Sequence, residues 1–181
     1  RDLAELVLSG QPTLTSVGMA AINALLPRYP ELYFEANAEE SIARYGAGKR
    51  VALVGHFPFV PRLRDRVGEL VVLELQPGPG DSPADQAPVV LPQAQVVAIT
   101  GMALVNGTLE NLLELCPQNS FVMVLGPSTP LSPVMFEYGI NLLSGSLVTA
   151  IDPVLRAASQ GGNFRQLHRA GVQLVNMQRS V

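Results

Sequence analysis

From Arg50 onward the sequence alternates short, nearly continuous apolar runs with segments in which apolar residues recur at helical spacing. The runs are RVALVGH (50–56), ELVVLEL (69–75), QVVAITG (95–101), SFVMVLG (120–126), INLLSGSLVT (140–149) and VQLVNM (172–177). Strands this apolar are typical of a sheet that helices cover on both faces, because neither face then meets water. The pattern predicts an α/β fold with a doubly wound, mostly parallel sheet.

The segments between these runs carry helix start signals. Pro61, Thr108, Ser132 and Asp152 each stand where a helix is expected to begin. The stretch 76–88, QPGPGDSPADQAP, is rich in proline and glycine and predicts an irregular surface loop after the second strand.

Before residue 47 the pattern is that of amphipathic helices. Helices are predicted over 2–8, from Thr15 or Ser16 to just before Pro27, and over 38–46. The chain begins with Arg1 inside a helical pattern, so we expect a truncated or processed start. The predicted division is a helical segment over 1–46 and one α/β domain over 47–181.

Composition narrows the expected partners. The 181 residues are 48% hydrophobic and 15% charged, with a formal net charge of −3. This balance offers no basic surface for a phosphate backbone, so no nucleic acid is expected. The longest apolar run, 95–105, is shorter than the ~18 residues that cross a bilayer, so we expect no membrane insertion. The single cysteine, Cys116, cannot form an internal disulfide, which favours a cytoplasmic location.

Ligands of an open parallel sheet bind beyond the carboxyl ends of its strands, and this rule selects the candidate site residues. His56 is the candidate catalytic residue, as a general acid/base or hydrogen-bond donor, and Phe57 is expected to form an apolar wall. The predicted ligand-binding residues are Gly55, Phe57, Pro58, Glu74, Thr100, Gly101, Asn106, Gly107, Thr108, Gly126, Pro127, Ser128 and Thr129.

Each candidate also has a structural interpretation. His56 could bond a neighbouring loop, Glu74 could end a strand in solvent, and 106–108 could be a turn that leads to a helix cap. Glu74 follows Gly55 at roughly the 20-residue separation of an acid that binds ribose hydroxyls. The later glycines of a pyrophosphate loop are missing after Gly55, so NAD binding is not expected.

Five motifs in order resemble one protein family: SVGMAAINALL, GKRVALVGHFPFV, VVAITGMALVNGTLENLLEL, LGPSTPLSPVMFEYG and SQGGNFRQL. The family is described as "putative heavy-metal chelation" and contains bacterial and archaeal proteins. Its members join an enolase-N-terminal-like domain to a Rossmann-like domain. The resemblance implies that 47–181 are Rossmann-like, that 1–46 are the helical tail of the first domain, and that the site lies where the domains meet.

The family description mentions heavy metals, so the side chains that could bind such a metal were counted in the sequence. Soft heavy metals prefer several convergent thiolates and imidazoles, and this chain has one cysteine and two histidines. A tight protein-only thiolate site is therefore not expected within a monomer, and no residue is assigned as a metal ligand. The alternatives are oxygen ligands from Glu74 or loop hydroxyls, or a small organic chelator bound by the protein, which we favour.

The leading hypothesis is a protein that binds a small, planar, polar organic ligand at the strand ends, with condensation or hydrolysis as the suggested reaction. The resemblance implies a pterin-, flavin- or siderophore-like compound. Two alternatives remain open: a non-catalytic module that binds a metal–chelator complex, and a protein similar to AdoMet-dependent methyltransferases. The expected partner is a small-molecule ligand or chelator. No cofactor is assigned, and a homodimer is left open.

Overall fold

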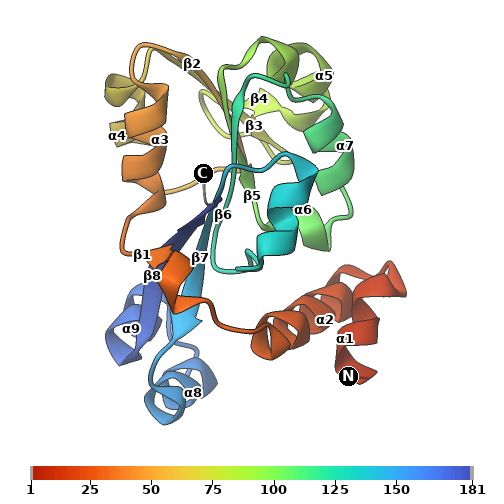
Figure 1. Cartoon of the computed structure of the whole chain (residues 1–181), viewed down its shortest axis with the longest axis vertical. Helices are drawn as coiled ribbons and strands as arrows, with labels where there is room; N and C mark the ends of the chain where they lie inside the picture. The colour runs from red at the N-terminus through yellow and green to blue at the C-terminus, as the bar shows by residue number, and fades with distance from the viewer. Residues whose placement is uncertain (1, 180–181) are drawn as a thin grey trace.

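The structure, a computed structural model, describes residues 2–179, and within them the strands form one eight-stranded sheet (Figure 1). The strands are β1 (Tyr33–Phe34), β2 (Arg50–Val54), β3 (Glu69–Glu74), β4 (Ser82–Pro83), β5 (Val96–Thr100), β6 (Phe121–Leu125), β7 (Leu142–Val148) and β8 (Val172–Gln178). Their order is β1-β8-β7-β6-β5-β2-β3-β4. β2 to β7 are parallel, whereas β8 is antiparallel to β7 and β1 to β8. The predicted α/β, mostly parallel sheet is confirmed.

Helices cover both faces of the sheet, as Figure 1 shows, with α3 and α4 on one side and α5, α6 and α7 on the other. The α-helices are α1 (Asp2–Glu5), α2 (Pro12–Leu25), α3 (Ala38–Gly46), α4 (Val60–Leu63), α5 (Ala87–Val90), α6 (Met102–Val105), α7 (Leu109–Glu114), α8 (Ile151–Ser159) and α9 (Phe164–Ala170). Short 3-10 turns are η1 (Leu6–Ser9), η2 (Pro30–Leu32), η3 (Arg64–Arg66), η4 (Ala84–Gln86), η5 (Leu91–Gln93) and η6 (Pro133–Tyr138).

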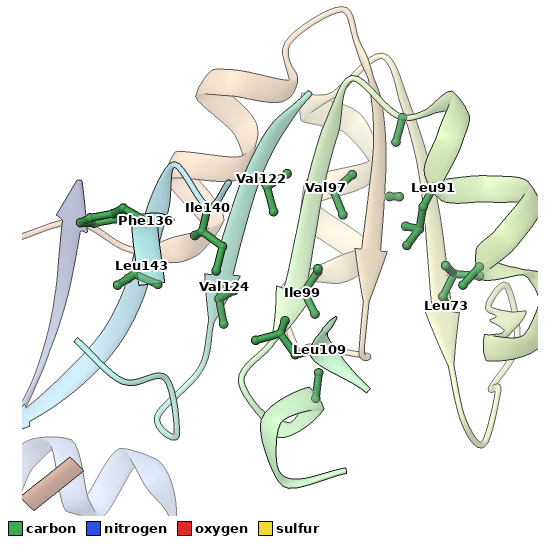
Figure 2. Packing of buried hydrophobic residues seen from close by; sticks show 14 of the residues in the cluster. Leu73, Leu91, Val97, Ile99, Leu109, Val122, Val124, Phe136, Ile140 and Leu143 are labelled. Atoms are coloured by element: carbon green, nitrogen blue, oxygen red, sulfur yellow. The ribbon is translucent and has the colours of Figure 1, made fainter. Parts of the chain in front are cut away.

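Successive side chains of the central strands point alternately into two separate hydrophobic cores. Val97 and Ile99 of β5 point into the core beneath α5 and α7, where Leu91 and Leu109 meet them (Figure 2). Val96 and Ala98 of the same strand join the opposite core, which contains Ile42 and Leu63. Because side chains alternate between the faces of a strand, burial on both faces requires every position to be apolar. This requirement explains the continuous apolar runs.

Several boundaries differ from the predicted ones. α2 begins at Pro12 rather than at Thr15 or Ser16, because a proline fits the first helical turn without losing a hydrogen bond. α8 begins at Ile151, so Asp152 lies within the first turn instead of capping it. The predicted loop 76–88 contains the two-residue edge strand β4 and a helical turn. Strands this short carry no periodic signal.

The amino-terminal helices contact the rest of the fold in two different ways. α3 packs directly on it, and its Ile42 is fully buried. α1, η1 and α2 pack on one another, so closely that a Cβ added at Gly18 would lie 2.2 Å from the backbone nitrogen of Val7. α2 touches the rest of the fold beside α6 (Figure 1). The division predicted at residues 46 and 47 stays a prediction.

Among residues 2–179, no helix combines the length and the apolar character that crossing a bilayer requires.

Candidate functional site

The strand order reverses between β2 and β5, because β2 pairs with β3 on one side and with β5 on the other. Gly55 follows β2 with a φ of +100°, and Thr100 ends β5. A Cβ added at Gly55 would lie 3.0 Å from the Cβ of Thr100. Both the positive φ and this close approach require glycine. The loop that follows Gly55 therefore begins at the point where doubly wound sheets bind ligands.

A cavity of about 360 Å³ opens at this point, and we call it the switch-point cavity. Its walls come from the ends of β2, β3 and β5 and from α6 and α7. The structure brings seven of the predicted site residues together around it: Gly55, His56, Phe57, Glu74, Thr100, Asn106 and Thr108.

The imidazole of His56 is held by a buried carboxylate. Its Nδ1 atom lies 2.9 Å from Oδ2 and 3.1 Å from Oδ1 of Asp81. The His56 side chain is 44% exposed, whereas that of Asp81 is 2% exposed. Asp81 also accepts a hydrogen bond from the backbone N–H of Gly78. This pairing favours the tautomer that carries its proton on Nδ1, which leaves Nε2 as an acceptor.

Asp81 was not among the residues predicted from the sequence. It belongs to the segment 76–88, which was interpreted as a surface loop. The available signal was positional: this loop follows β3, so it emerges at the same sheet edge as His56. An aspartate in such a loop is a candidate partner for a strand-end histidine.

Glu74 positions the loop that carries His56. Its Oε2 accepts a hydrogen bond of 2.8 Å from the backbone N–H of His56, and its Oε1 accepts one of 2.7 Å from that of Leu75. Both carboxylate oxygens therefore already bind the protein backbone, which leaves fewer lone pairs for the hydroxyls of a ligand. Glu74 lines the switch-point cavity while it fixes the cavity wall.

Phe57 supplies a stiff apolar wall. Its ring stacks on that of Phe59, with centroids 5.2 Å apart and planes 12° from parallel. Phe57 also packs against the core beneath α3 and α4. An aromatic side chain held on two sides offers a ligand a flat surface at a fixed position.

A second cavity of about 530 Å³ lies between α2, α6 and the ends of β6 and β7, and we call it the α2 cavity. The predicted residues Pro127, Ser128 and Thr129 line this cavity rather than the first. Met102 lines both cavities, and its Sδ accepts a hydrogen bond of 3.7 Å from the Ser128 hydroxyl. The predicted site thus consists of two compartments that share one methionine.

Four predicted residues line neither cavity in the described structure: Pro58, Gly101, Gly107 and Gly126. Gly101 provides close packing, since a Cβ there would lie 2.9 Å from both N and Oγ1 of Thr129. Gly107 and Gly126 have φ values of +66° and +120°, so they form turns between elements.

The donor set does not fit a soft heavy-metal ion held by the protein alone. The Cys116 thiol donates to the carbonyl of Leu112, and burial raises its pKa to about 11. His168 is exposed on α9, apart from both cavities. Across residues 2–179, no three histidine, cysteine, aspartate or glutamate side chains gather closely enough to hold a metal ion. Such a metal needs three or four convergent ligands.

Residues 37–177 match the model of the DUF364 family, described as "Putative heavy-metal chelation". A crystal structure of a DUF364 protein of unknown function from Desulfitobacterium hafniense has a TM-score of 0.87 at 30% identity, over 98% of this chain and 74% of that chain. A second one, from Pyrococcus horikoshii, has a TM-score of 0.80 at 19% identity, over 97% and 74%.

A curated relative, an uncharacterized protein of Methanocaldococcus jannaschii, is 28% identical over 149 residues. The match includes 77% of this chain but 57% of that protein, so the chain spans little more than half the length of this relative.

Proposed function

Because the chain belongs to the DUF364 family, we propose that it binds a small, polar organic compound in the switch-point cavity and that His56 is the group that acts on it. The compound is a metal chelator of pterin-, flavin- or siderophore-like character. This choice reconciles the family description with a donor set that does not suit direct binding of a soft metal.

The observation that carries this proposal is the pairing of His56 with Asp81. An exposed imidazole held through Nδ1 by a buried carboxylate has a fixed orientation and tautomer. Its Nε2 makes no hydrogen bond to any of residues 2–179 and remains for a ligand. The cavity volume of about 360 Å³ lies within the range of small-molecule sites.

The arrangement supports proton transfer. Nε2 of His56 takes a proton from an attacking water or substrate hydroxyl, and Asp81 stabilises the imidazolium that forms by accepting from Nδ1–H. The same proton then passes from Nε2 to the leaving group. This sequence of steps serves either hydrolysis or its reverse, condensation. Phe57 presents a flat surface against which a planar ligand stacks.

A second candidate function is non-catalytic binding of a metal–chelator complex for transfer to another protein. The description of the family favours it, since chelation requires no reaction. The two candidates differ in what His56 must do. Binding needs a hydrogen-bonding group at this position, whereas catalysis needs one that titrates.

The experiment is to denature the purified protein and identify by mass spectrometry the compound that it retains. We expect His56→Ala to retain roughly tenfold less of that compound, because one hydrogen bond in a partly desolvated cavity is lost. His168→Ala is the matched control, since His168 is an exposed histidine on α9 that lines neither cavity.

Equal retention by His56→Ala and the wild type would contradict the proposed site. The identified compound then serves as ligand for His56→Gln, which keeps a donor and an acceptor but cannot exchange protons near neutral pH. Binding that survives while turnover is lost supports catalysis. Binding that survives in a protein with no turnover in either form supports the second candidate.

A further inference from the structure

An arginine outside both cavities holds the loop that carries Asp81. Arg64 of η3 donates from Nη2 to the backbone carbonyl of Gly80 at 2.9 Å and from Nη1 to that of Leu70 at 3.3 Å. Leu70 belongs to β3, and Gly80 directly precedes Asp81 in the loop 75–81. One guanidinium therefore ties this loop to the strand before it, because its N–H donors lie in a rigid plane and reach two carbonyls at once.

The backbone of Arg64 is itself anchored by the residue before it. Leu63, the last residue of α4, is fully buried in the core beneath α3 and α4. Arg64 is exposed, but it follows directly from this buried position. Its two hydrogen bonds therefore tie the loop to the core of the domain.

The peptide unit between Gly80 and Asp81 is held at both ends. Its carbonyl oxygen accepts from Arg64, and its N–H, which belongs to Asp81, donates to the carbonyl of Gly78 at 3.0 Å. Oδ2 of Asp81 accepts in return from the N–H of Gly78 at 3.1 Å. A peptide unit is planar, so fixing its oxygen and its nitrogen sets the direction in which the Asp81 side chain leaves the backbone toward His56.

The connection between β2 and β3 contacts the loop at two adjacent residues. His56 stands near the start of this connection and bonds Asp81, and Arg64 stands near its end and bonds Gly80. Gly80 has a φ of +85°, a conformation that favours glycine, and a Cβ there would lie 3.4 Å from Nη2 of Arg64. Backbone conformation and side-chain contact thus agree on one position for Asp81.

We infer that Arg64 is a positioning residue of the candidate site, which places Asp81 so that Asp81 fixes the tautomer and orientation of His56. Arg64 lines neither cavity of the described structure, so it acts through Asp81 and does not touch the ligand. Supporting contacts of this kind matter because a functional side chain must be held in its productive geometry. The inference rests on the proposed function for its effect on a ligand, whereas its effect on the imidazole ring can be measured without one.

The test compares the His56 ring in the wild type and in Arg64→Met. Methionine keeps a long, unbranched side chain but has no hydrogen-bond donor. The ¹⁵N chemical shifts of the ring report the ratio of its Nδ1–H and Nε2–H forms. We expect this ratio to fall about fivefold, because the carboxylate is no longer fixed at the Nδ1 atom. Unfolding curves should change little, since replacing an exposed side chain rarely costs much folding free energy.

Three further variants show whether Arg64 acts through Asp81. Arg64→Lys keeps the charge and a donor for one carbonyl, so it should restore part of the ratio. Arg66→Met is the matched control, because Arg66 lies in the same 3-10 turn but contacts Glu39, and it should leave the ratio unchanged. The double variant Arg64→Met, Asp81→Asn should give the ratio of Asp81→Asn alone, because the two residues form one pathway.

A wild-type ratio in folded Arg64→Met would overturn the inference, as would an equal change in Arg66→Met or a further change in the double variant. If Arg64→Met does not fold, Arg64→Gln, which reaches one carbonyl at most, is measured in its place against the same outcomes. A lowered ratio combined with full retention of the compound by His56→Ala would support the positioning role and overturn the proposed function. The two failures are therefore distinguishable.

Discussion

The Nδ1 atom of His56 lies 2.9 Å from Oδ2 of Asp81, so that a histidine at the mouth of a cavity is anchored by a carboxylate from another loop. The two residues follow different strands, β2 and β3, which lie side by side in the sheet. The parallel register brings both loops to the same edge. A carboxylate in this position fixes the tautomer and stabilises the protonated ring, as in other histidine-dependent sites.

The first prediction concerns this pair. Asp81→Asn should reduce binding or turnover of the retained compound about tenfold or more, because the amide cannot stabilise the imidazolium. The ¹⁵N chemical shifts of the His56 ring should show loss of the Nδ1–H tautomer, a change that a loss of stability alone would not produce. Asp85→Asn, an exposed position of the same segment, is the control. Unchanged ring shifts in Asp81→Asn would contradict the assigned role.

The second prediction tests the close approach of β2 and β5. Gly55→Ala should lower the free energy of unfolding, because a side chain at φ +100° is strained and its Cβ would meet Thr100. Gly126→Ala is the comparison, because Gly126 has a φ of +120° and the nearest atom to an added Cβ would lie 3.9 Å away. The loss for Gly55→Ala should therefore exceed that for Gly126→Ala by about 1 kcal/mol or more, as overpacking does. Chemical denaturation measures both, and equal losses would refute the steric argument.

The sheet could be predicted well from the sequence, because the burial of each strand determines the residue types within that strand alone. Burial on both faces makes every position of a strand such as β5 apolar, and that signature can be read without the fold. The candidate residues of the strand ends followed from the same pattern. Seven of them do line one cavity, since parallel strands bring their carboxyl ends to one edge.

Pairings across the fold could not be predicted in the same way. The contact between Asp81 and His56 depends on the path of a proline- and glycine-rich loop, which has no periodicity. The division into two compartments depends on the side chain of Met102, the first residue of α6, whose Sδ accepts a hydrogen bond from the Ser128 hydroxyl. The α2 cavity requires α2 to lie beside α6 and the loop after β6, and this placement rests on long-range contacts such as Asn23 to Ser128.

The third prediction follows from an ion pair outside both cavities. The hydrogen bond from Arg62, together with the charges of Arg62 and Arg66, holds the pKa of Glu39 below its usual value of 4.5. A carboxyl group with a lowered pKa stabilises the fold above about pH 4.5 and loses this contribution as the pH falls through the lowered value. Glu39→Gln should lower Tm by roughly 2–4 °C at pH 7.

The difference in Tm between wild type and Glu39→Gln should shrink steadily below about pH 4.5, and thermal scans over pH 3–7 measure it. Glu40→Gln is the control, because Glu40 is the exposed neighbour on the same helix. A difference that stays constant across this range would show that charge is not its cause.

The fourth prediction concerns the thiol of Cys116. Burial raises its pKa to about 11, and the thiol donates to the Leu112 carbonyl. Alkylation by iodoacetamide should therefore be slow at neutral pH and should accelerate with pH up to about 11, since the thiolate is the reactive form. The protein unfolded in urea is the comparison and should react much faster at pH 8. Equal rates at pH 8 would mean that the thiol is accessible and ionised, and would reopen the case for a thiolate ligand.

The last prediction separates two roles of Glu74. If this carboxylate bound the hydroxyls of a sugar, as in the methyltransferase-like alternative, Glu74→Gln would weaken binding of AdoMet and leave the loop unaffected. The hydrogen bonds from the His56 and Leu75 backbone N–H groups favour a positioning role instead. We expect Glu74→Gln to speed hydrogen exchange of these two amides about tenfold, because glutamine has a single acceptor oxygen.

Retention of the compound bound near His56 should fall in parallel, since the loop that presents the imidazole is no longer fixed. Asn106→Ala is the matched control for the exchange rates alone, because Asn106 lines the same cavity without holding either amide. Amides that exchange at the wild-type rate in Glu74→Gln, together with weaker AdoMet binding, would contradict the positioning role and favour the methyltransferase-like alternative.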